Sequence, residues 1–186
     1  PIKQNHKQHD LSIKHLEWLK SNFENVITKE ISLDSIFSSF EETMNDFKNN
    51  LAFANSRSRL RMITLYQIAQ SNNGLVVGTG NKVEDFGVGF FTKYGDGGVD
   101  ISPIADCTKT QVWEIASKMS IIQDIIEAQP TGGLWDDSRN DEGQLGLTYK
   151  QIEEAMDNKD SKYCEKYMQI RKQNLHKMKP IPICLF

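Results

Sequence analysis

Residues 75–80 read Leu-Val-Val-Gly-Thr-Gly, and the fold can be inferred outward from this stretch. Leu75, Val76 and Val77 form an apolar run without polar alternation, which is typical of a strand buried on both faces of a parallel sheet. Gly78 ends the run and lets the chain turn sharply. Segments with helical periodicity lie on both sides of it, so helices and strands alternate along the chain. This alternation predicts a doubly wound α/β fold with a parallel sheet.

Hydrophobic periodicity outlines the remaining elements. Further strands are expected at Val26–Leu33 and at Ile101–Ile104, and a polar loop at Pro130–Gly146. Neither a repeat nor a linker divides the chain, so we expect residues 1–186 to form a single domain. Helices are expected at Asp10–Glu24, from Asp34 through Met44, and at Ala52–Gln70, Thr110–Met119, Thr148–Asp157 and Ser161–Met178.

Composition narrows the possible functions. The chain carries 22 Lys and Arg against 25 Asp and Glu, a formal net charge of −3, so it lacks the basic face that nucleic-acid binding needs. No apolar run approaches the roughly 18 residues of a membrane span. Cys107, Cys164 and Cys184 form no CxxC pair, which argues against a zinc ribbon or a redox motif. We therefore expect a cytoplasmic protein with reduced thiols that binds neither nucleic acid nor membrane.

The stretch Phe90–Asp100, FFTKYGDGGVD, combines three glycines with a lysine, two carboxylates and three aromatic rings. Its glycines can take positive φ and let the backbone approach a ligand closely. Lys93 can neutralise a phosphate, while Asp96 and Asp100 can accept hydrogen bonds from hydroxyls or amides. The alternative interpretation is a plain glycine-rich turn between two elements.

Other candidate residues are weak when each is taken alone. Glu84 lies five residues after Thr79, about one helical turn further on, where its carboxylate could hold Mg²⁺ against nucleotide phosphates; a surface glutamate on a capped helix is the alternative. Arg57, Arg59 and Arg61 are either solvated arginines on a helix exterior or contain a clamp for phosphate or carboxylate. Lys109 lies near the start of a helix, where it opposes the helix dipole unless an anion binds there.

Taken together, these strings resemble the ammonia-dependent NAD synthetases, a family of N-type ATP pyrophosphatases. The matching stretches run in the family's order from residue 55 to the C-terminus. The resemblance implies a flavodoxin-like sheet of the adenine nucleotide alpha hydrolase type. The stretches are Asn55–Met62 (NSRSRLRM), Gly78–Glu84 (GTGNKVE), Phe90–Asp100, Pro103–Val112 (PIADCTKTQV), Pro130–Trp135 (PTGGLW), Asp141–Tyr149 (DEGQLGLTY) and His176–Met178 with its proline-rich tail.

The resemblance also implies a reaction and a set of site residues. Deamido-NAD (nicotinic acid adenine dinucleotide) would be adenylated by ATP with Mg²⁺, releasing pyrophosphate, and ammonia would then displace AMP to give NAD. Such a site must stabilise negative charge on phosphates and on a tetrahedral intermediate. The implied ATP-binding residues are Thr79, Lys109 and Thr131, of which Lys109 and Thr131 are also catalytic, and the implied Mg²⁺ ligand is Glu84. The implied deamido-NAD-binding residues are Arg59, Lys93, Asp100, His176 and Lys177.

Members of this family form homodimers with the dinucleotide site at the subunit interface, and residues 52–70 are our candidate for part of it. The family's phosphate loop, Ser-Gly-Gly-x-Asp-Ser after the first strand, does not occur in the sequence. We therefore expect the single domain to be N-terminally incomplete, without the first strands of the sheet, and inactive as a synthetase by itself. Two alternatives are the synthetase domain of a glutamine-dependent NAD synthetase and a non-catalytic dinucleotide-binding remnant.

Overall fold

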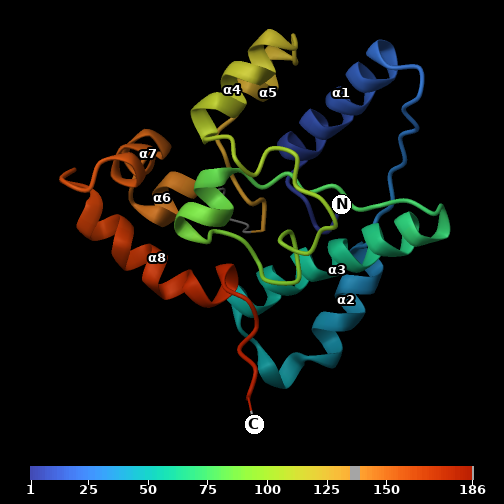
Figure 1. Ribbon diagram of the computed structural model, residues 1–186. Coiled ribbons are helices and arrows are strands. Elements are labelled where there is room, and N and C mark those ends of the chain that lie inside the picture. Colours follow the sequence, from blue (N-terminus) through green and yellow to red (C-terminus); the bar gives the residue numbers. More distant parts are fainter. Residues whose placement is uncertain (135–138, 186) are drawn as a thin grey trace.

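The computed structural model describes residues 1–134 and 139–185, and these residues are mostly helical (Figure 1). The predicted helices are all present, with ends shifted by a few residues, and the predicted polar loop at 130–146 contains α6. The helices are α1 (His6–Asn22), α2 (Asp34–Thr43), α3 (Asn50–Ser71), α4 (Lys109–Lys118), α5 (Gln123–Ile126), α6 (Asp141–Leu145), α7 (Tyr149–Asp157) and α8 (Cys164–Met178), with a 3₁₀ turn η1 (Asn45–Phe47) and a π-helical segment η2 (Lys82–Val88).

Local side-chain contacts explain where two of these helices begin. Thr108 accepts a hydrogen bond from the backbone of Gln111, whose side chain reaches back to the Thr108 amide, so a capping box starts α4. Thr148 and Gln151 form the same reciprocal pair at the start of α7. These caps set the first residues of both helices, Lys109 and Tyr149, in defined positions.

The predicted sheet is reduced, among the described residues, to one isolated parallel bridge between Val77 and Ile101. Residues 26–33 form no strand. Val76 is buried, but Leu75 and Val77 are 65% and 55% exposed, so the expectation of a run buried on both faces is wrong here. A buried parallel strand depends on neighbouring strands for its hydrogen bonds and its cover, and residue 101 supplies the one described bridge.

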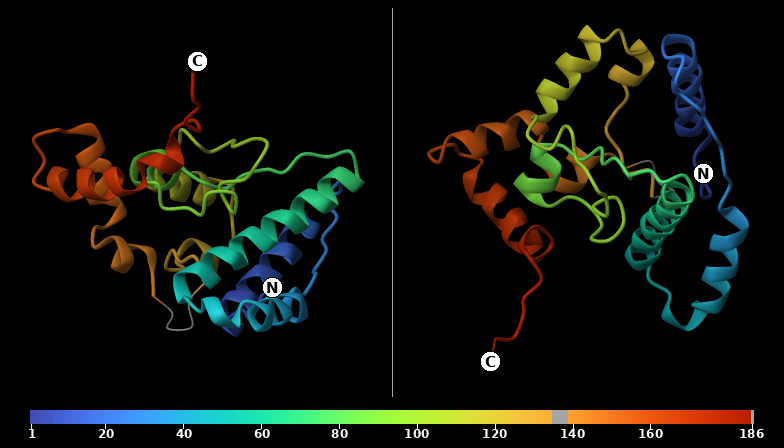
Figure 2. Two further views of the ribbon diagram at one scale, coloured as in Figure 1. Left: turned by 90° about the horizontal axis from the view of Figure 1, so that it is seen from below. Right: turned by 45° about the vertical axis from the view of Figure 1, so that its right-hand side comes forward.

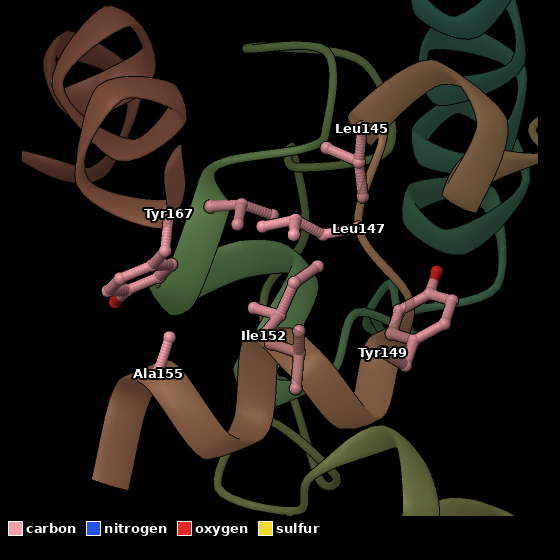
Figure 3. Packing of buried hydrophobic residues seen from close by; sticks show 8 residues of the cluster. Leu145, Leu147, Tyr149, Ile152, Ala155 and Tyr167 are labelled. Atoms are coloured by element: carbon pink, nitrogen blue, oxygen red, sulfur yellow. The ribbon is translucent and has the colours of Figure 1, made fainter. Parts of the chain in front are cut away.

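Two apolar clusters hold the helices. The smaller one joins α2 to α3 through Phe37, Leu33 and Ile2. Figures 1 and 2 show the segment 72–108 running between the α1–α3 group and the α6–α8 group. The larger cluster packs η2 against α7 and α8 (Figure 3); its buried members are Val83, Val88, Leu145, Leu147, Tyr149, Ile152, Ala155 and Tyr167.

Burial of an apolar side chain stabilises the fold by about 1.5–3 kcal/mol, so the larger cluster fixes η2, and with it Glu84, relative to α7. The packing of this cluster thus presents one rigid corner, η2 with α4, α6 and α7, and a glycine-rich loop at 92–98 beside it.

In the described part of the chain, no helix is both long and apolar enough to cross a bilayer.

Candidate functional site

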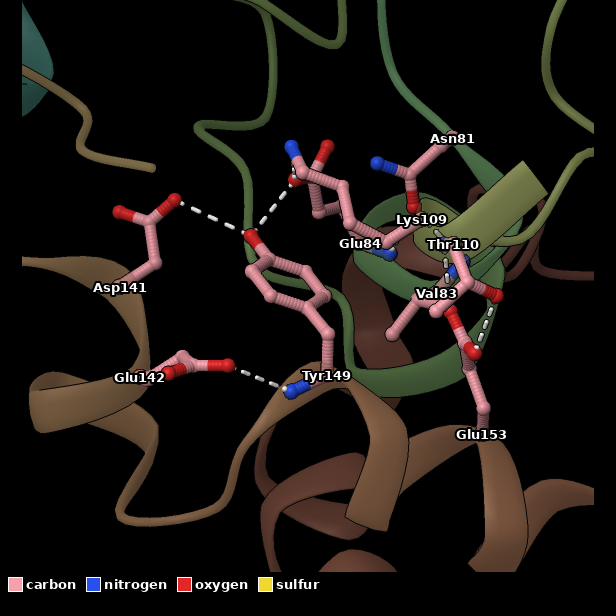
Figure 4. Close-up of polar contacts among 9 residues, drawn as sticks. All are labelled: Asn81, Val83, Glu84, Lys109, Thr110, Asp141, Glu142, Tyr149 and Glu153. Carbon is pink, nitrogen blue, oxygen red and sulfur yellow. Dashed lines mark hydrogen bonds and ion pairs between the residues drawn. The ribbon is translucent and has the colours of Figure 1, made fainter. Parts of the chain in front are cut away.

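Glu84 and Lys109 form the centre of the rigid corner (Figure 4). The Asn81 side chain caps η2 by accepting hydrogen bonds from the amides of Val83 at 3.0 Å and Glu84 at 3.1 Å. Lys109 is the first residue of α4, and its Nζ lies 2.9 Å from Oε1 of Glu84. Both side chains are mostly buried, so this ion pair is screened less than a surface pair.

The Tyr149 side chain contacts both members of this ion pair. Its hydroxyl lies 2.7 Å from Oε1 of Glu84 and 3.1 Å from Oδ2 of Asp141, at the start of α6. The Tyr149 ring also lies 4.9 Å under the Lys109 ammonium, a cation–π arrangement. Burial, followed by the charge of Glu84, raises the pKa of the Tyr149 phenol far above its ordinary value, so the hydroxyl stays protonated.

Asp141 and Tyr149 are residues of this site to which the sequence analysis assigned no role, although both lie inside the matched stretch DEGQLGLTY. Burial raises the pKa of Asp141; the Tyr149 hydroxyl opposes that shift and the charge of Glu84 adds to it. Oδ1 of Asp141 is buried without a hydrogen-bond partner among the described residues. The single phenolic proton of Tyr149 is shared by the carboxylates of Glu84 and Asp141, so it cannot fully satisfy both of them.

This donor set fits part of a Mg²⁺ site. Within residues 1–134 and 139–185, no group of three or more His, Cys, Asp or Glu could hold a metal ion. Mg²⁺ in nucleotide sites is commonly bound through one or two carboxylates plus substrate phosphates. Glu84 can supply one such carboxylate, and the ammonium of its partner Lys109 is a cation that could face a phosphate.

Thr79 and Thr131, the other residues implied to bind ATP, do not join this cluster in the structure. Thr79 is exposed and has no hydrogen-bond partner in the described part of the chain. The Thr131 hydroxyl donates to the carbonyl of Arg139 at 3.0 Å and accepts from the amide of Gly133 at 3.2 Å, so its contacts lie within its own loop. The amide of Asp141 donates to the carbonyl of Pro130, which ties this loop to α6.

Four of the five residues implied to bind deamido-NAD gather around the glycine loop; we call Arg59, Lys93, His176 and Lys177 the cationic group. Nε of Arg59 donates to the Lys93 carbonyl at 3.3 Å, and Nζ of Lys93 donates to the His176 carbonyl at 3.1 Å. The resemblance thus identified residues that the fold brings together from α3, the loop and α8.

Lys177 anchors the loop to the end of α8. Its Nζ donates to the carbonyls of Gly89 at 2.7 Å and Phe91 at 2.8 Å. Burial lowers the pKa of Lys177, and the negative charge of Asp96 opposes that shift. The Lys177 side chain therefore ties the end of α8 to the segment that precedes the glycine loop.

Asp100, the fifth residue, is engaged elsewhere. Its Oδ1 accepts from the Tyr66 hydroxyl at 3.1 Å and its Oδ2 accepts from the Val76 amide at 2.8 Å. The carboxylate therefore links α3 to the apolar run at 75–77. A ligand hydroxyl would have to share this carboxylate with the Tyr66 hydroxyl.

Asp96 holds the glycine loop in shape. Its Oδ1 accepts from the Ser58 hydroxyl at 2.7 Å and from the Thr92 amide at 3.0 Å, and its own amide donates to Oγ of Ser58 at 2.9 Å. The hydroxyl and amide partners expected for this carboxylate are thus the protein's own.

The glycines of the loop are required for close packing and not for positive φ. A Cβ on Gly95 would collide with Oγ of Ser58, and one on Gly97 would collide with the Phe91 ring. Positive φ falls instead on Tyr94, at +62°. The expectation of left-handed glycines in this loop is therefore wrong, because the backbone approaches α3 and its own aromatic residue.

The other two arginines of α3 have separate contacts. The Arg57 guanidinium lies 5.2 Å over the Phe37 ring and Nη1 donates to the Leu134 carbonyl at 3.3 Å. Nη2 of Arg61 donates to Oε1 of Gln4 at 2.9 Å. The arginines therefore fan around the helix, as their alternate spacing predicts.

Comparison with known proteins adds a family to this geometry. The profile of the NAD synthase family matches residues 2–181. An NH(3)-dependent NAD(+) synthetase from Carboxydothermus hydrogenoformans is 44% identical over 128 residues, which cover 69% of this chain and 52% of that protein. A solved NMN synthetase from Francisella tularensis superimposes with a TM-score of 0.88 at 30% identity, covering 98% of this chain and 75% of the other. An NH3-dependent NAD synthetase from Campylobacter jejuni superimposes with a TM-score of 0.71 at 21% identity, covering 100% and 75%.

The fold is therefore one shared by synthetases of pyridine nucleotides. The chain belongs to the NAD synthase family, which confirms the resemblance read from its motifs. It spans about half the length of the curated relatives that it matches.

Proposed function

We propose that this protein is a ligase that amidates deamido-NAD with ammonia at the expense of ATP, releasing AMP and pyrophosphate and forming NAD. The observation that carries the proposal is the contact between Glu84 and Lys109, together with a cationic group built from three separate segments. The named activity of the relative from Carboxydothermus supports the same reaction.

The proposed reaction suits the chemistry of the corner. A carboxylate is a poor acyl donor, and adenylation gives it a leaving group. Lys109 would neutralise phosphate oxygens of ATP and of the departing pyrophosphate, and the hydroxyls of Thr79 and Thr131 would donate to them. Mg²⁺, held in part by Glu84, would supply further neutralisation of phosphate charge when bound.

The cationic group would hold the dinucleotide. Arg59, Lys93 and Lys177 can neutralise its two phosphates, and Asp100 can accept from a ribose hydroxyl. The backbone carbonyl of His176 accepts from Nζ of Lys93, and the His176 imidazole would be left for the ligand. We further propose a cytoplasmic homodimer in which α3 forms part of the interface.

Exposed apolar side chains on α3 support that interface: Leu51 is 57% exposed, Ile63 59% and Leu65 52%. Residues 63 and 65 project to different sides of the helix, so they offer separate apolar contacts and not one continuous row. The parallel bridge between Val77 and Ile101 supports a doubly wound sheet of the flavodoxin-like type in this family.

A second candidate function is amidation of the mononucleotide. The solved structure with a TM-score of 0.88 is an NMN synthetase. Its product differs from NAD by the absence of the adenosine monophosphate half. The two candidates therefore predict different ligands for the cationic group.

Calorimetric titration of the 186-residue chain separates these candidates. We expect nicotinic acid adenine dinucleotide to bind more tightly than nicotinic acid mononucleotide, and the reverse order would favour the second candidate. Lys93→Ala should weaken binding, whereas Lys118→Ala, an exposed lysine at the end of α4, should not. A folded chain that binds neither nucleotide would contradict the proposal.

Turnover is tested with ATP, Mg²⁺, the dinucleotide and either ammonia or glutamine, by following AMP and NAD. The proposed adenylation predicts that any NAD formed is matched by an equal amount of AMP. Formation of NAD with glutamine as the better nitrogen source would favour the glutamine-dependent form. Binding of the dinucleotide without any adenylate formation would favour a non-catalytic remnant.

A further inference from the structure

Tyr94 stands out in the glycine loop because its backbone and its side chain are both unusual. Its φ is +62°, in the left-handed region that favours glycine and, after it, asparagine. Its ring is 54% exposed. A bulky aromatic residue in this region is an outlier that persists only where the surroundings hold it.

The surroundings do hold it. The amide of Gly95 donates to the Thr92 carbonyl at 2.9 Å, and the amide of Gly98 donates to the Gly95 carbonyl at 2.9 Å. Asp96 ties the same turn to α3 through Ser58. The loop therefore fixes residue 94 in the left-handed region from both sides.

Stability gives no reason for an aromatic ring at this position. A half-exposed ring buries little apolar surface, and the backbone conformation is one that glycine or asparagine adopts with less strain. The ring is nevertheless placed beside the proposed dinucleotide site. Nζ of Lys93 lies 5.5 Å from its centroid, and the Lys93 carbonyl accepts from Arg59.

We propose that the Tyr94 ring is a stacking surface for a heteroaromatic ring of the bound nucleotide, a binding residue in addition to the cationic group. This inference rests on the proposed function. The neighbouring cations would hold the phosphates, and a flat ring held rigidly beside them would fix the orientation of the base or of the nicotinate. Base stacking on an aromatic side chain is strong enough to change affinity about tenfold or more.

The test replaces Tyr94 without disturbing the loop. Tyr94→Asn keeps a residue that tolerates positive φ and removes the ring, whereas Tyr94→Phe keeps the ring. Phe47→Asn on η1 removes an exposed ring (71%, against 54% for Tyr94) from another segment of the chain and is the control. Each chain is titrated with nicotinic acid adenine dinucleotide by calorimetry, and its thermal midpoint is recorded.

We expect Tyr94→Asn to weaken dinucleotide binding about tenfold or more, with a thermal midpoint equal to or above that of the parent chain. Tyr94→Phe and Phe47→Asn should bind within about twofold of the parent. Titration with nicotinic acid mononucleotide assigns the stacked ring: an equal loss identifies the nicotinate, and a loss confined to the dinucleotide identifies the adenine.

If the parent chain binds the dinucleotide and Tyr94→Asn binds it equally well, the stacking role is overturned while the proposed function stands. If the folded parent chain binds neither nucleotide, the proposed function fails and this inference fails with it. Tyr94→Gly, which relieves the backbone of residue 94, gives the same comparison if the asparagine variant does not fold.

Discussion

Nζ of Lys109 lies 2.9 Å from Oε1 of Glu84, and each side chain is only 17% exposed. The cation proposed for phosphate and the carboxylate proposed for Mg²⁺ therefore neutralise each other in this structure. Removing one member of such a pair leaves an uncompensated charge in a poorly solvated place. ATP and Mg²⁺ would have to replace this contact with contacts of their own.

The first prediction concerns Lys109→Met. Loss of the ammonium leaves Glu84 beside the buried Asp141, so the free energy of unfolding should fall by about 2–3 kcal/mol in urea titrations. The control is Lys82→Met, whose partner Asp106 is almost fully exposed at 3.0 Å, and it should cost less than about 1 kcal/mol. Equal losses of unfolding free energy in the two variants would show that burial of the Glu84–Lys109 pair does not increase its contribution to stability.

The second prediction concerns the hydroxyl between two carboxylates. Tyr149→Phe keeps the buried ring and removes the donor shared by Glu84 and Asp141. The free energy of unfolding at neutral pH should fall by about 1.5–3 kcal/mol, as for a hydrogen bond to a charged group. Tyr163→Phe on the neighbouring turn is the matched control and should stay within about 0.5 kcal/mol of the parent. An unchanged Tyr149→Phe would mean that water replaces the phenol without cost.

The third prediction is a pH dependence at Asp85. Burial first, then the charges of Glu84 and Asp96, raises the pKa of Asp85 from 3.8 to about 6. Folding therefore takes up a proton between these values. The stability that protonated Asp85 contributes is present below pH 3.8 and is lost as the pH rises through about 6.

Asp85→Asn removes this loss. In EDTA, the variant should be more stable than the parent by about 1 kcal/mol at pH 7, after allowance for partial solvent screening, and the gain should disappear near pH 4. Asp46→Asn, on the exposed turn η1, is the control for a general charge effect. The same gain at pH 4 and pH 7 would contradict the assignment.

The fourth prediction concerns Gly95→Ala. The added Cβ meets Oγ of Ser58 and the Thr92 side chain, so the loop must move away from α3. We expect a loss of about 1–3 kcal/mol in unfolding free energy and weaker dinucleotide binding. Gly132→Ala is the control, because its Cβ would find Leu134 at an ordinary 3.8 Å. Full retention of binding by Gly95→Ala would show that the loop tolerates displacement.

Local sequence signals predicted the helices well. Periodic apolar residues and the threonine caps at 108 and 148 act within a few residues, so α4 and α7 begin near the expected positions. The motifs also predicted Glu84, Lys109 and Lys93 as candidate site residues, although no motif specifies their contacts. Strand pairing was predicted poorly, because a strand at 75–77 has no local reason to exist without partners.

The amino-acid order was sufficient for what depends on neighbours in sequence: the helices, their capped ends, the family and the chemical types at the candidate site. Contacts between residues that are far apart in the sequence were decided by the tertiary structure. Tyr149 reaches Glu84 across 65 residues, and Asp96 reaches Ser58 across 38. Such contacts depend on how η2, α3 and α7 pack. The residues next to a hydroxyl or carboxylate in the sequence do not specify which distant group will become its hydrogen-bond partner.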